Sequence, residues 1–100
     1  MNGGVVLNEE SADVDFRVES NGNANMLFVS GGNDVVGIGA EGDLGVGLHI
    51  KVSDTGASVS TGADALVIED NGGDMGMSIL SSTSGEGKIA FVDRDWETLI

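Results

Sequence analysis

The sequence contains no cysteine and no proline, and both basic residues and aromatic rings are scarce. Without cysteine there is no disulfide framework, no thiolate catalysis and no zinc site built on thiolates. Only 4 residues are Lys or Arg, against 17 Asp or Glu, and the net charge is -13 at pH 7. Because binding to phosphates is driven by basic side chains, this balance predicts that neither nucleic acid nor an anionic membrane is a partner.

Long apolar segments are missing as well. No run of about 18 apolar residues is present that could span a bilayer, and residues 1–4 lack the basic start and apolar block of a signal peptide. The chain also has no long polar linker. These absences predict one domain over residues 1–100.

What the sequence does contain is 17 glycines and short apolar stretches, with 40% of the residues hydrophobic. Several stretches alternate apolar and polar residues with the period of two that is typical of β-strands. Between them lie turns rich in Gly, Asn and Asp, which accept positive φ. The predicted strands cover residues 14–18, 26–29, 48–52, 65–68, 75–79 and 88–92.

Short strands at regular spacing predict an all-β fold with a repetitive architecture, a β-prism or β-helix-like fibre segment. Ordering a residue costs about 1.5 kcal/mol, which a glycine-rich chain with few aromatic rings recovers poorly on its own. We therefore expect oligomerisation to complete the fold.

Residues 16–22 and 66–72 share one order of residue types: apolar, any, apolar, Glu, polar, Asn, Gly. Each segment is followed by a small polar turn and then by a stretch that contains Met. Two interpretations stay open, a structural repeat and a chance likeness between two glycine-rich strand–turn units.

Three patterns bear on catalysis or binding. Residues 37–42 match the glycine pattern of a dinucleotide-binding turn, but the residues that follow are unsuited to the helix that would hold a pyrophosphate. A glycine-rich turn or a close approach of neighbouring backbones is the preferred interpretation. His49 alternates with apolar neighbours and is predicted to be a solvated surface residue. Since no serine lies in a nucleophile elbow, we expect no enzymatic activity.

Residues 31–36 and 72–77 are similar to parts of the glycine- and aspartate-rich repeat of calcium-loaded β-rolls. Carboxylates and turn carbonyls are ligands that Ca²⁺ prefers. The only cofactor that the sequence suggests is such a structural Ca²⁺ ion, which would relieve charge repulsion between chains. Its candidate ligands are Asp13, Asp15, Asp34 and Asp74.

The first half resembles the repeated sequences of tail fibre and tailspike-like proteins of tailed bacteriophages. The resemblance is carried, in the same order, by residues 14–20, 25–29, 36–39 and 47–50. Residues 65–70, 77–81 and 87–91 are similar to the strands that follow in such fibres. The resemblance covers roughly residues 5–93. It implies a trimeric fibre segment in which neighbouring copies close the apolar face of each chain. The chain departs from that family in its short length and in lacking proline after residues 36–39.

The combined prediction is a structural fibre protein of a virion or an extracellular filament. Its partner is itself, as a homotrimer or a longer homopolymer joined by strand pairing and a shared apolar core. One alternative is an adhesin tip that grips a host-surface glycan with residues 93–96, and the other is a calcium-binding β-roll. The residues expected to form the assembly core are Phe16, Val18, Leu27, Phe28, Ile38, Leu48, Ile50, Leu66, Ile68, Ile79, Ile89 and Phe91.

Overall fold

The structure, a computed structural model, describes residues 3–94, and the fold within this range is all-β, as the sequence predicts. All strands of these residues belong to one sheet, and none of these residues is helical. The strands are short because glycine-rich turns interrupt the chain every few residues. They are β1 (Phe16–Val18), β2 (Leu27–Val29), β3 (Val36–Ile38), β4 (Leu48–Lys51) and β5 (Leu66–Glu69).

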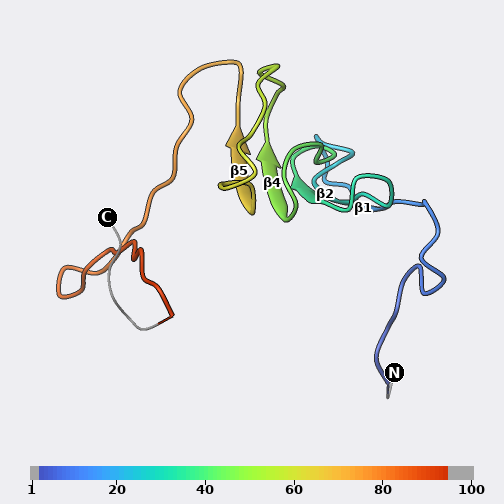
Figure 1. Cartoon of the computed structure of the whole chain (residues 1–100), viewed down its shortest axis with the longest axis horizontal. Coiled ribbons are helices and arrows are strands. Elements are labelled where there is room, and N and C mark those ends of the chain that lie inside the picture. Colours follow the sequence, from blue (N-terminus) through green and yellow to red (C-terminus); the bar gives the residue numbers. More distant parts are fainter. Residues whose placement is uncertain (1–2, 95–100) are drawn as a thin grey trace.

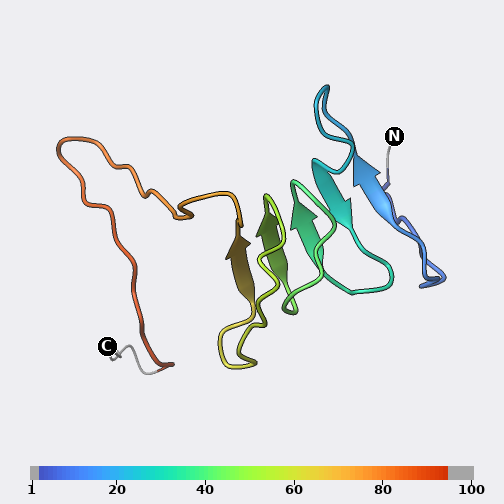
Figure 2. The same cartoon turned by 90° about the horizontal axis from the view of Figure 1, so that it is seen from above.

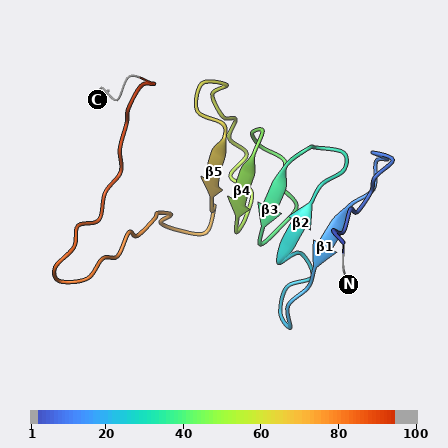
Figure 3. The ribbon, with the colours of Figure 1, turned by 90° about the horizontal axis from the view of Figure 1, so that it is seen from below.

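The sheet combines an antiparallel part with a parallel part. β1, β2 and β3 form an antiparallel meander, whereas β4 pairs with β3 and β5 pairs with β4 in parallel. As a result β1, β3, β4 and β5 point the same way and β2 alone is reversed (Figure 2). The strands follow one another across the sheet in chain order, so β1 and β5 are its open edges (Figure 3).

Parallel neighbours are usually joined by a helix, but here residues 39–47 and 52–65 connect them without one. The first connection lies against the chain beside it because it is rich in glycine. Gly45 has a φ of 81°, and a Cβ on Gly45 would overlap the carbonyl oxygen of Asp64. A Cβ on Gly42 would lie 2.5 Å from Cγ1 of Val35. The close backbone approach predicted for residues 37–42 is confirmed, although Gly37 itself lies in β3, a strand that the sequence analysis missed.

One face of the sheet is covered, and it holds the small core. Phe28, His49 and Val67 share this face, and they are 6%, 0% and 8% exposed. Residues 39–47 contribute to the cover, since Gly42 packs beside His49. Val35 is the remaining buried apolar residue in the described range.

The prediction that His49 is a solvated surface residue is wrong, because its side chain is fully buried. The alternation in residues 48–52 separates the two faces of β4 correctly, with Leu48 and Ile50 on one side and His49 on the other. The connection of residues 39–47 covers the His49 face. Alternation identifies the two faces of a strand, but it does not tell which one another segment will cover.

Residues 70–94 leave the sheet after β5 and run away from it (Figure 1). The strands predicted at 75–79 and 88–92 are wrong, as neither stretch forms a strand; only Val92 makes an isolated bridge. Their apolar residues, Met77 and Ile89 among them, are exposed, so these stretches have alternation but no sheet to join. The radius of gyration of 16.9 Å exceeds the roughly 13 Å of a compact domain of this length.

Candidate functional site

The face of the sheet opposite His49 consists of apolar side chains, and the described residues leave most of it without cover. We call it the apolar face. Each of the five strands contributes two side chains to it, and none of them is buried. The strand register aligns them in two rows, the first of Phe16, Val29, Val36, Leu48 and Leu66 and the second of Val18, Leu27, Ile38, Ile50 and Ile68.

Exposure on this face is greatest toward the two edges of the sheet. Phe16 in β1 is 40% exposed and Leu66 in β5 is 49% exposed, while Leu48 and Ile50 in β4 are half-buried by their neighbours in the rows. Burying such a side chain fully is worth roughly 1.5–3 kcal/mol. Contiguous apolar surface of this kind is typical of an interaction site.

The structure places most of the predicted assembly residues on the apolar face. Phe28 lies on the covered face instead, where it belongs to the core of the single chain. Ile79, Ile89 and Phe91 lie in the exposed segment after β5 and are not brought to the face. The remaining residues of the predicted set are there, namely Phe16, Val18, Leu27, Ile38, Leu48, Ile50, Leu66 and Ile68.

Val29 and Val36 also belong to the apolar face, and the sequence analysis missed both. The signal for Val29 is its spacing of two from Leu27 in the predicted strand 26–29. Val36 has the same relation to Ile38, but Gly37 between them suggested a turn. A glycine in a strand marks a close approach of another backbone, and here it faces Ala40 and Gly42.

The covered face carries a buried polar network centred on His49 and Glu69. Nε2 of His49 lies 2.8 Å from Oε1 of Glu69, and Nδ1 accepts a hydrogen bond of 3.2 Å from the backbone N–H of Asp43. Since Nδ1 accepts a hydrogen bond, the neutral ring carries its proton on Nε2, and this N–H donates a hydrogen bond to Oε1 of Glu69. The other oxygen of Glu69 accepts from both the N–H and the hydroxyl of Thr55, at 2.8 Å each.

These hydrogen bonds change the acidity of Glu69. The backbone N–H of Thr55 is the largest influence and holds the pKa of Glu69 below its ordinary value of 4.5. Burial acts in the opposite direction, and the hydroxyl of Thr55 and the ring of His49 reinforce the lowering of the pKa. Glu69 is therefore a carboxylate near neutral pH, and its hydrogen bonds hold it between His49 of β4 and Thr55 of the connection 52–65.

Lys51 and Asp43 form an ion pair at the border of this network, with 3.0 Å between Nζ and Oδ1. Burial alone would lower the pKa of Lys51, but the hydrogen bond to Asp43 and the charge of that carboxylate raise it above its ordinary value. Asp43 is half exposed, so water screens the pair.

Asp43, His49 and Glu69 have ligand atoms within 4.8 Å of one another. Protein groups already occupy both ring nitrogens of His49 and both oxygens of Glu69. Ligation of an ion by His49 would require one of the hydrogen bonds of its ring to break, so the cluster serves to join β4, β5 and the two connections.

The carboxylates predicted to hold a cation lie apart from that cluster. Asp15 accepts a hydrogen bond of 2.9 Å from the N–H of Gly31, and Asp34 has a left-handed φ of 55° in the turn between β2 and β3. Asp74 lies far along the chain, in the exposed segment after β5, and Asp13 lies near Gly32. Among residues 3–94, none of the four belongs to a group of three side chains close enough to share an ion.

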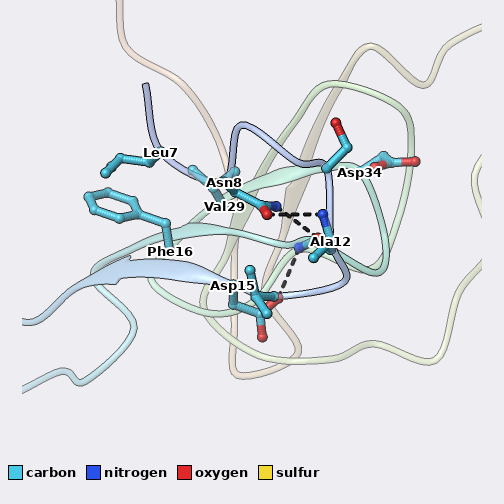
Figure 4. A pocket seen from close by; sticks show the side chains of 10 residues that line it. Leu7, Asn8, Ala12, Asp15, Phe16, Val29 and Asp34 are labelled. Atoms are coloured by element: carbon cyan, nitrogen blue, oxygen red, sulfur yellow. Dashed lines mark hydrogen bonds between the residues drawn. The ribbon is translucent and has the colours of Figure 1, made fainter. Parts of the chain in front are cut away.

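A pocket of about 680 Å³ lies where residues 7–14 approach β1 and β2. The side chain of Leu7 lies beside the ring of Phe16 at one end, and Asp34 lies at the other (Figure 4). Asn8 closes the turn of the N-terminal segment by hydrogen bonds with Ala12 of 2.8 and 3.0 Å. The pocket thus continues the apolar face at its β1 end.

Part of the predicted glycan site, which includes Trp96, lies outside the described residues. Comparisons with protein-family models, with curated proteins and with solved structures gave no match. Within the described residues, no helix is long and apolar enough to cross a membrane. The function of this chain is therefore inferred from its own geometry.

Proposed function

We propose that this chain is a structural, non-enzymatic fibre protein that assembles from copies of itself, like a shaft segment of a phage tail fibre. The single observation that carries the proposal is the apolar face, which all five strands build and whose side chains the described residues leave half-buried or exposed. A folded chain with such a face lowers its free energy by placing the face against another copy.

The small core of the single chain supports the same proposal. Only Phe28, Val35 and Val67 are buried apolar residues within the described range, whereas the apolar face offers more such side chains than the core. Assembly would bury them without any change of fold. The product is a homotrimer or a longer homopolymer, a component of a virion tail fibre or of another extracellular filament.

The charge distribution fits a fibre that packs through one face only. The apolar face carries no charged side chain, although the whole chain has a net charge of -13. Within the described residues, the acidic side chains lie on the connections and flanking segments, apart from the buried Glu69 of β5. Repulsion between these segments would keep finished fibres apart while leaving the face free to associate.

The test is the mass of the native particle at micromolar concentration, measured by light scattering after size exclusion. We expect a trimer or a larger particle, and filaments in negative-stain images. Ile50→Asp places a charge in the centre of the face and should lower the mass of the particle, because the faces can no longer pack together. Ala57→Asp adds the same charge to an exposed connection and should leave the particle unchanged. A folded wild-type monomer of 10.1 kDa would contradict the proposal.

A further inference from the structure

The two edges of the sheet are open, and their geometry is complementary. Edge strands present backbone N–H and C=O groups that can pair with another chain. Within residues 3–94, no hydrogen bond engages the outer side of β1 or of β5. We propose that copies join head to tail, with the outer edge of β5 in one copy pairing in parallel with the outer edge of β1 in the next.

The outward groups of β5 follow from its pairing with β4. The carbonyl oxygens of Ala65 and Glu69 accept hydrogen bonds of 3.0 and 2.9 Å from the β4 chain. Alternate residues of a parallel strand bond to opposite sides. Leu66 and Ile68 therefore direct their N–H and C=O groups away from the sheet.

The outward groups of β1 follow from the register of β2. The N–H of Gly39 donates to the carbonyl of Met26 at 3.1 Å, which places Met26 and the alternate residue Phe28 on the β3 side of β2. Arg17 lies opposite Phe28. In an antiparallel pair, opposite residues bond to each other or both face away, so Arg17 directs its N–H and C=O groups outward.

The direction of the strands makes the two edges fit without rotation. β1 and β5 point the same way, because β2 alone is reversed. A second copy that is shifted sideways presents β1 parallel to β5 of the first. Arg17 of that copy would then lie between Leu66 and Ile68, opposite Val67, with its N–H bonded to Leu66 and its C=O to Ile68.

This register also continues the apolar face across the junction. With Arg17 opposite Val67, Phe16 of the second copy extends the row that ends in Leu66, and Val18 extends the row that ends in Ile68. The sequence likeness between residues 16–22 and 66–72 falls on these two edge strands. β1 of a following copy thus offers β5 the same alternation that β5 offers β4.

A junction of this kind uses two different surfaces, and because the copies are related by a sideways shift without rotation, it produces an open chain of copies and not a closed ring. With five strands per copy and about 4.8 Å between strands, the sheet would grow by about 24 Å per copy. The inference rests on the proposed function, in which the apolar faces of such sheets then pack together. Edge pairing and face packing are separate contacts and can be tested separately.

The first experiment blocks one edge at a time. Proline removes an N–H and is tolerated where that N–H faces away from the sheet. Arg17→Pro blocks β1 and leaves β5 open, whereas Ile68→Pro blocks β5 and leaves β1 open. Neither variant should grow alone, and a 1:1 mixture should double the mass of the particle that each forms alone. Ser58→Pro, in the exposed connection 52–65, should assemble like wild type.

The second experiment uses the absence of cysteine in the chain. Phe16→Cys and Leu66→Cys place single thiols on opposite edges, directly across the proposed junction. Oxidation should give disulfide dimers in a mixture of the two variants and little in either variant alone. As a control, Leu48→Cys lies in the same row but inside the sheet, and its mixture with Phe16→Cys should give much less dimer. If a proline variant fails to fold, the cysteine variants still test whether β5 of one copy pairs with β1 of the next.

The outcomes separate the two proposals. If wild-type protein is a monomer, the proposed function fails. If wild-type protein assembles, but mixing the proline variants leaves their mass unchanged or single cysteine variants cross-link as well as the mixture, only head-to-tail pairing is overturned.

Discussion

The two faces of the sheet invert the usual arrangement of a globular domain. The covered face holds His49 and Glu69, both polar, while the apolar face lies open. The covered face owes its burial to connections within the same chain. The difference teaches that burial in this molecule follows the path of the glycine-rich connections, and that the described residues provide no comparable cover for the apolar face.

The largest expected contrast between the faces comes from truncating one phenylalanine on each. Phe28→Ala removes a buried ring, which costs about 3–5 kcal/mol, so its melting temperature should fall at every protein concentration. Phe16→Ala removes a ring that is 40% exposed, so it should weaken assembly and leave the dilute chain nearly as stable. Thermal melts over a hundredfold range of concentration measure both effects. Equal losses from the two variants would remove the distinction between the faces.

Lowering the pH should destabilise the fold through the covered face, where Glu69 is buried. The pKa of Glu69 is lower in the folded chain than its ordinary value of 4.5. Such a carboxyl stabilises the fold above its unfolded pKa, and this contribution is lost as the pH falls through the folded pKa. Stability against urea should therefore decrease below about pH 4.5.

Glu69→Gln provides the matched control for the acid effect, because it keeps the shape of the side chain without its charge. The variant should be less stable at pH 7 by about 1–3 kcal/mol, since His49 and Thr55 lose a charged acceptor. It should also lose part of the dependence on pH below 4.5. A variant that keeps the full dependence would show that other carboxyls govern the acid response.

Salt should act mainly on the apolar face, by strengthening assembly. Copies with a net charge of -13 repel one another, and added salt screens that repulsion. We expect several-fold tighter assembly between 20 mM and 500 mM NaCl, and a stronger effect from divalent cations at equal ionic strength. Sedimentation equilibrium measures the change. Assembly that weakens with salt would mean that ion pairs, and not apolar contacts, join the copies.

The smallest effect is expected at the border of the covered face. Lys51→Ala breaks the pair with the half-exposed Asp43, and exposed pairs of this kind contribute about 0.2–1 kcal/mol. Urea unfolding should show a loss in that range. A much larger loss would mean that Lys51 supports the network of His49 through the connection that carries Asp43.

The sequence predicts the strands of this fold better than their surroundings. The alternation in 14–18 and 48–52 predicts both a strand and its two faces, because side-chain direction has a period of two in any strand. Strand β3 was not predicted, because Gly37 at its centre suggests a turn. The stretches 75–79 and 88–92 carry a comparable alternation but find no strand to pair with, and that is a long-range property which no local pattern contains.

The sequence predicts part of the apolar face, but it does not predict which residues the connections bury. Leu48 and Ile50 follow from alternation alone, and the structure places them on the apolar face together with Leu66 and Ile68, which belong to a continuous apolar run. The burial of His49 was not predictable, since it requires knowing that residues 39–47 fold back across β4. The neighbours of Phe28, Leu27 and Val29, are also apolar, so the sequence does not reveal which face of β2 the ring of Phe28 occupies. For this reason Phe28 was assigned to the assembly core.

The lengths of the connections have a consequence for the order of folding. The connections up to β4, residues 19–26, 30–35 and 39–47, are short, whereas β5 must wait for the longer connection of residues 52–65 to close. We therefore expect the β1 edge to be ready before the β5 edge in a newly made chain. A late chain would then dock its finished β1 onto the β5 of a mature one, so that filaments elongate from one end only.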